Sequence, residues 1–245
     1  MDVFHWSPDA TAPVLVLALL CVGYSAYWFV SHSAGLRRWV AQRHGDERVA
    51  AYLPLYQKHI GVLLLGVVPL ATVLLVLPYD LMDYGLGRSN PALFTYWTLA
   101  LCALVIPLGI LSGRKPETQT VYPQVRAREW DLPLIVLNAL TWAAYLFAYE
   151  LLFRGILLAV CVPVMGIWPA IALNVVLYAL AHLPKGPLET FGALPFGVVL
   201  CMSTLLTGTI WVAFVSHVAL AWANDYAALR YHPEMRVLVR RRADV

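Results

Sequence analysis

The chain has 245 residues, of which 61% are hydrophobic and only 13% are charged. A soluble domain usually carries about 25% charged residues, so this composition excludes an ordinary soluble protein. The formal net charge of +3 is small, and basic residues beside apolar segments are better explained by membrane topology and anionic lipid head groups than by nucleic acid. The sequence therefore predicts the lipid bilayer as a partner, and no nucleic acid.

Seven apolar segments are suited to cross the bilayer as helices. Three lie in the first half of the chain, at residues 13–30, 60–77 and 93–111. Four follow Asp131, at residues 132 to about 160, 168–181, 193–206 and 209–228. The segment that begins at Leu132 is too long for one straight crossing, so we expect a kink, a strong tilt or a break within it. The sequence thus predicts an all-α polytopic membrane protein with seven or eight transmembrane helices.

The basic residues predict the orientation of these helices. Of the 17 Lys and Arg residues, 14 lie in three segments: Arg37, Arg38, Arg43, Arg48 and Lys58; Arg114, Lys115, Arg126 and Arg128; Arg230, Arg236, Arg240, Arg241 and Arg242. The positive-inside rule places all three segments in the cytoplasm. The acidic N-terminus and the loop with Asp80 and Asp83 then face outside, which agrees with seven crossings.

Three regions divide the chain, and no repeat or long linker separates soluble domains. Residues 1–131 contain the first helices and their cytoplasmic loops. Residues 132–228 form a helical core, and residues 229–245 form a basic cytoplasmic tail.

Ionisable residues are rare in the helical core, and two of them lie four residues apart. Glu150 and Arg154 share one helical face, where they can neutralise each other. An isolated charge at bilayer depth costs about 2.5–3.5 kcal/mol, so such a pair is rarely accidental. Arg154 is best interpreted as the residue that orients Glu150 and keeps it ionised.

Further polar residues are predicted to meet this pair. Gly166 marks a turn, and it lies 16 residues after Glu150 and 16 residues before His182. In an antiparallel hairpin those two residues fall at the same depth. On the last segment His217 and Asp225 follow helical spacing. Three helices can thus present Glu150, His182, His217 and Asp225 to one cavity, although a lone membrane His is as often a helix–helix hydrogen-bond donor.

Three motifs in this core resemble those of the CPBP intramembrane protease family, which includes the type II CAAX prenyl proteases and Abi-like proteins. They are Tyr149-Glu150-Leu151-Leu152-Phe153-Arg154-Gly155, Tyr178-Ala179-Leu180-Ala181-His182 and His217-Val218-Ala219-Leu220-Ala221. Tyr149 stands where the family usually has a first Glu, and Ala221 where it usually has Asn. A bacterial branch looks similar in both respects, and it also carries residues that match Lys185, Glu189 and Asp225. The resemblance makes Glu189 and Asp225 candidates, while Lys185 and Glu189 are otherwise explained as a solvated loop pair.

The resemblance implies an intramembrane endopeptidase in a bacterial cytoplasmic membrane. Glu150 would activate water, with Glu189 as a second carboxylate, while His182 and His217 would stabilise the oxyanion or bind a metal. Two His side chains with Glu150 or Asp225 make a plausible zinc site, but we favour the metal-free mechanism. The substrate would be a membrane-embedded protein or peptide, and no residue pattern predicts a groove for a prenyl group.

Two other functions remain open from the sequence. The departures at Tyr149 and Ala221 favour a catalytically silent membrane scaffold or binding protein. A small transporter is less favoured, because the paired broken helices of transporters are absent from the sequence pattern.

Overall fold

A computed structural model describes residues 6–238, which form two compact units. Of the described residues, the first unit comprises 6–28, Gly61–Leu99 and Phe147–Val215, and the second comprises Phe29–Ile60, Ala100–Leu146 and 216–238. Asp2 of the predicted outer terminus and Arg240, Arg241 and Arg242 of the predicted basic tail lie outside the described residues.

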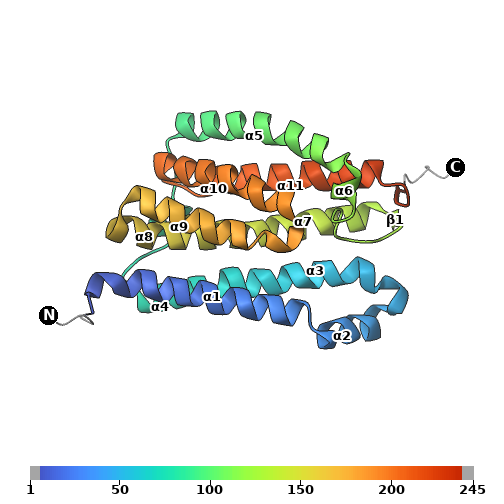
Figure 1. Cartoon of the computed structure of the whole chain (residues 1–245), viewed down its shortest axis with the longest axis horizontal. Helices are drawn as coiled ribbons and strands as arrows, with labels where there is room; N and C mark the ends of the chain where they lie inside the picture. The colour runs from blue at the N-terminus through green and yellow to red at the C-terminus, as the bar shows by residue number, and fades with distance from the viewer. Residues whose placement is uncertain (1–5, 239–245) are drawn as a thin grey trace, which may run out of the picture. The chain divides into compact units, whose positions relative to one another are not determined.

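Every apolar segment predicted to cross the membrane is helical, which confirms the all-α fold (Figure 1). Five segments are single helices: α1 (Thr11–Ser31), α5 (Pro91–Gly113), α9 (Ile167–Leu180), α10 (Pro187–Thr207) and α11 (Trp211–Tyr231). Two are composite: α3 (Val49–Gly61), η3 (Val62–Val67) and α4 (Val68–Val76); α7 (Leu132–Glu150), η5 (Leu151–Leu157) and α8 (Leu158–Met165). By length and composition, the stretches 8–31, 46–76, 91–113, 132–165 and 187–207 of the described chain are suited to span a membrane. The protein is therefore a polytopic helical membrane protein.

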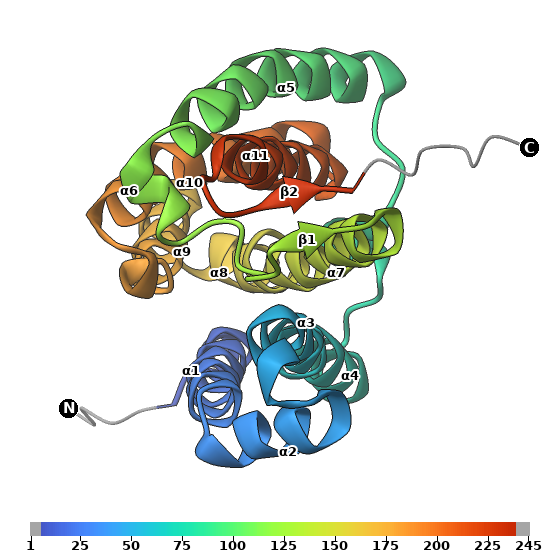
Figure 2. The ribbon, with the colours of Figure 1, turned by 90° about the vertical axis from the view of Figure 1, so that its right-hand side faces the viewer.

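Short elements connect these helices. They are η1 (Pro8–Ala10), α2 (Ala34–His44), η2 (Asp46–Arg48), η4 (Met82–Leu86), α6 (Pro116–Gln119), β1 (Glu129–Trp130), η6 (Leu183–Lys185) and β2 (Arg236–Val237). The two strands pair in parallel, with Glu129 opposite Arg236 (Figure 2).

The predicted break in the long segment from Leu132 is a change of helix type. The π-helix η5 begins directly after Glu150. Such π-helical turns are rare and occur often at functional sites. The change of helix type thus occurs at Glu150, the acid of the first motif.

Lys58 is a correction to the predicted first loop. It lies within α3, and only 3% of its surface is exposed. Its ammonium nitrogen lies 4.4 Å from the ring centroid of Trp142, where a cation–π contact accommodates the charge. Because the helix starts at Val49 rather than near Ile60, Lys58 belongs to the helical bundle of the second unit and not to a solvated loop.

Glycines allow close helix contacts around the break in the first unit. A Cβ atom on Gly66 of η3 would lie 2.6 Å from the Cβ of Ala148, and one on Gly155 would lie 2.8 Å from the carbonyl oxygen of Tyr84. Only glycine permits these distances. The end of α7 is therefore packed closely against η3, and η5 against the η4 turn.

In the second unit, two glycines bring α5 against α11. A Cβ on Gly109 would lie 2.9 Å from the Leu220 carbonyl oxygen, and one on Gly113 would lie 2.5 Å from the Asn224 carbonyl oxygen. This four-residue spacing of small residues is typical of tightly packed membrane helices. It fixes the helix that carries His217 and Asp225.

Candidate active site

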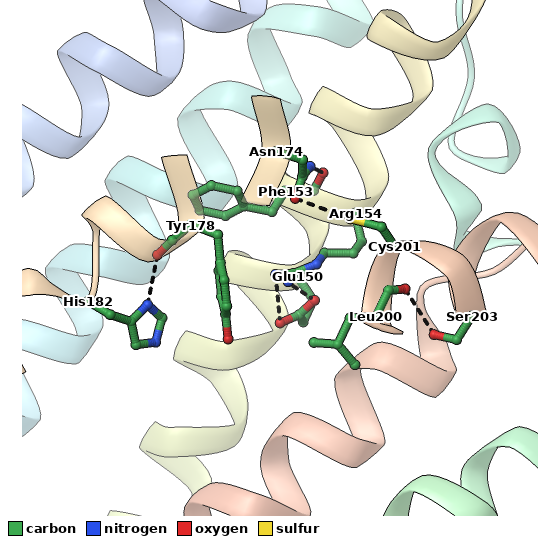
Figure 3. Close-up of polar contacts among 9 residues, drawn as sticks. All are labelled: Glu150, Phe153, Arg154, Asn174, Tyr178, His182, Leu200, Cys201 and Ser203. Carbon is green, nitrogen blue, oxygen red and sulfur yellow. Dashed lines mark hydrogen bonds and ion pairs between the residues drawn. The ribbon is translucent and has the colours of Figure 1, made fainter. Parts of the chain in front are cut away.

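The Glu150–Arg154 ion pair lies at the junction of α7 and η5 (Figure 3). Arg154 Nη1 lies 3.3 Å from Oε1 and 3.3 Å from Oε2 of Glu150. Neither side chain is more than 1% exposed. The pair predicted from the spacing is thus confirmed, and its two charges compensate each other in an interior where either alone would be costly.

Tyr178 of α9 packs against this pair. The Arg154 guanidinium carbon lies 4.1 Å from the Tyr178 ring centroid, within cation–π range. In Figure 3 the Tyr178 ring stands between His182 and Glu150. The residue interpreted from sequence as packing therefore also forms one wall of the site.

The predicted hairpin brings His182 to the level of the first motif. The helices α8 and α9 lie side by side and are joined at Gly166, whose φ of 83° requires glycine. The ring of Tyr149, the neighbour of Glu150, lies 6.1 Å from the His182 ring, centroid to centroid. This contact confirms the equal depth that was expected from counting 16 residues on each side of the turn.

A backbone hydrogen bond orients His182. Its Nδ1 lies 2.8 Å from the carbonyl oxygen of Tyr178. Because a carbonyl only accepts, Nδ1 carries the proton of this bond, which fixes the ring. Any action of His182 on a substrate or a metal would therefore be through Nε2.

Glu189 and Lys185 also belong to the first unit and follow His182 in the sequence. Both are half-buried, one in the first turn of α10 and the other in η6. Burial lowers the pKa of the Lys185 ammonium, and the charge of Glu189 opposes this shift. Glu189 is also within electrostatic reach of Tyr178. Glu189, the acid suggested by the resemblance, is thus half-buried, and its charge acts on Tyr178.

Asn174 is a buried residue that sequence reasoning missed. Its Nδ2 donates to the Phe153 carbonyl oxygen at 2.6 Å, and its Oδ1 accepts from the Cys201 thiol at 3.4 Å. The same Phe153 carbonyl accepts the backbone N–H of Leu158 within the π-helical segment. Asn174 therefore fastens α9 to the turn that follows Glu150. Its spacing of four and eight residues before Tyr178 and His182 was the available signal.

His217 and Asp225 lie on α11 in the second unit, and both are buried. Asp225 Oδ2 accepts a hydrogen bond from Asn138 Nδ2 at 2.7 Å. Eight residues of helix separate the two candidates by about 12 Å along the axis, at 1.5 Å per residue. The two side chains are therefore anchored at different heights on α11.

Comparison with known families then identifies the core. Residues 128–223 match the family model described as type II CAAX prenyl endopeptidase, Rce1-like. This part of the chain is thus similar to the Rce1-like proteins. No curated protein and no solved structure matches the chain. The Rce1-like segment contains Glu150, Arg154, His182, Glu189 and His217, and it ends two residues before Asp225.

Within its described residues, the structure offers few groupings of the residue types that ligate metals. Among residues 6–238, no three His, Cys, Asp or Glu side chains are grouped so as to hold a metal ion. The carboxylate of Glu150, the acid of the first motif, is already bound by Arg154.

Proposed function

We propose that this protein is an intramembrane endopeptidase that hydrolyses peptide bonds of membrane-associated proteins or peptides. The observation that carries the proposal is the buried Glu150–Arg154 pair beside the oriented His182, in a bundle of apolar helices. The Rce1-like family supports a CAAX-type protease. An acidic side chain inside the bilayer is energetically costly, so its presence there usually indicates a function.

In the proposed mechanism Glu150 is the general base. Its carboxylate takes a proton from a water molecule, whose oxygen attacks the scissile carbonyl carbon. The peptide C–N bond then breaks, and the proton passes to the departing amine. Arg154 holds the carboxylate ionised and limits its rotation, since Nη1 is equidistant from both oxygens.

His182 and His217 would stabilise the oxyanion in the metal-free form of this mechanism. With Nδ1 bonded to the Tyr178 carbonyl, His182 would act through Nε2. Because Nδ1 of His182 already donates to the Tyr178 carbonyl, donation from Nε2 to an oxyanion requires the imidazolium form of this residue, whereas metal ligation requires a neutral ring. A zinc ion bound there would polarise the carbonyl. We favour the metal-free form, because Arg154 competes with any metal for the Glu150 carboxylate.

Elemental analysis separates these two forms. We expect the purified, active protein to contain well under about one zinc per chain, and to keep its activity in a chelator. About one zinc per chain, lost together with activity in the chelator, would instead assign His182 and His217 as ligands.

Glu189 is proposed as the second carboxylate of the site. It would replace the acid that relatives carry beside Glu150, where this chain has Tyr149. The influence of its charge on Tyr178 supports this role. In the same proposal the N-terminus faces outside and the C-terminus faces the cytoplasm of a bacterial cell, as the charge distribution and the branch motifs suggest.

A silent scaffold is the second candidate function. It is favoured by Tyr149, whose ring packs against Phe153, Tyr178 and His182 where a further acid would add charge.

Deletion of the chain tests the proposed function in cells. We expect one or more membrane proteins to accumulate in unprocessed form, and to be processed again when the wild-type chain is restored. Mass spectrometry of protein termini in the membrane fraction measures this. An unchanged set of termini after deletion would contradict the protease and favour the scaffold.

A further inference from the structure

A second cluster of buried polar residues lies in the second unit. It contains Lys58 of α3, Asn138 and Trp142 of α7, and Asp225 of α11. None is more than 6% exposed. Two of them are full charges of opposite sign, and the hydrolytic step assigns no task to either.

Asp225 interacts with several other residues of this cluster. It accepts the 2.7 Å hydrogen bond from Asn138, and the charges of Lys58 and Arg126 act on it. Arg126 is held elsewhere, since Nη1 donates to the Gln119 carbonyl oxygen at 2.9 Å. Burial lowers the pKa of Arg126, and the charge of Asp225 opposes this shift.

Lys58 supplies the buried compensating charge. Its Nζ lies over the Trp142 ring at 4.4 Å, on the same helix that carries Asn138. A carboxylate and an ammonium buried together are tolerated, but removing one leaves the other uncompensated at a large cost. Replacing both is far less costly, because no lone charge remains.

The cluster joins three helices at one level. Asn138 and Trp142 are one turn apart on α7, while Lys58 and Asp225 come from α3 and α11. Hydrogen bonds and charge pairs fix rotation more specifically than apolar contacts, because their geometry is directional. Asp225 is therefore suited to set the rotation and height of α11, on which His217 lies about 12 Å away, at 1.5 Å per residue.

We propose that Lys58 and Asp225 are positioning residues: two buried charges of opposite sign, anchored by Trp142 and Asn138 respectively, that hold α11 so that His217 is directed correctly. The proposal rests on the protease function for its kinetic consequence. It assigns Asp225 a task that acts through the helix, without contact with the substrate.

A double-mutant cycle tests the pair with Lys58→Met, Asp225→Asn and the double variant. Each single change is expected to lower the Tm of the detergent-purified protein by about 10 °C, and the double variant is expected to lose less than either. Lys115→Met, which changes an exposed lysine, is the matched control and should leave the Tm unchanged. Additive losses in the double variant would overturn the coupling between the two buried charges.

Kinetics test the positioning role on the same variants, per folded molecule. We expect kcat to fall about tenfold or more in each single variant while KM stays within about twofold, because misplacing a group by about 1 Å is that costly. An unchanged kcat with a lowered Tm would overturn positioning and leave a purely structural pair. If the wild-type chain cleaves nothing, the proposed function fails while the Tm cycle still decides the pair.

Discussion

Replacing Glu150 by Gln is expected to abolish peptide cleavage while the protein stays folded. The amide keeps the size of the side chain and can still accept a hydrogen bond from Arg154, but it cannot take a proton from water. General-base catalysis contributes about 10²–10⁴-fold, so kcat/KM should fall by about 10³-fold. The measurement is cleavage of a membrane peptide by the purified protein in proteoliposomes.

Two further variants show whether the loss of cleavage is specific to Glu150. Glu47→Gln changes an exposed carboxylate, whose side chain is 76% accessible, and should be as active as the wild type. Glu189→Gln should show an intermediate loss if Glu189 is the second carboxylate. Cleavage by Glu150→Gln within about threefold of the wild type would remove Glu150 from the mechanism.

Replacing Arg154 by Met is expected to produce the largest loss of stability. It leaves the carboxylate of Glu150 buried without its cation, and it removes the cation that packs on Tyr178. Breaking a buried ion pair from one side costs about 3–5 kcal/mol. At about 2–4 °C per kcal/mol for a chain of this size, the Tm in detergent should fall by about 6–20 °C.

The double variant Glu150→Gln with Arg154→Met shows whether the lost charge balance is the cause. It should recover part of the stability that Arg154→Met loses, because no uncompensated carboxylate remains. Arg37→Met changes an exposed arginine and serves as the control. Equal Tm values for Arg154→Met and Arg37→Met would show that the buried pair does not stabilise the fold.

The fold could be predicted because the bilayer imposes simple rules on sequence. Apolar length and the turn at Gly166 were sufficient for the helices and for the depth of His182. The π-helical form of the break was not predictable, since it depends on contacts far along the chain, such as the Asn174 hydrogen bond to Phe153 and the close approach at Gly155.

Residues outside the motifs were placed less well. Lys58 was assigned to a loop because a basic residue near an apolar segment usually marks the cytoplasmic side. Its position inside the bundle depends on the face of Trp142 and on the charge of Asp225, which lie 84 and 167 residues away in the sequence. No local pattern reports such partners.

The most direct test of Glu150 as a general base is the fate of the oxygen atom during one turnover. Cleavage in ¹⁸O-labelled water with hydroxylamine present should place one labelled oxygen in the new C-terminal carboxylate of the substrate. No hydroxamate should form, and Glu150 should stay unlabelled, because water attacks the carbonyl directly. A hydroxamate product, or ¹⁸O in the Glu150 carboxylate, would show a covalent acyl-enzyme and contradict the mechanism.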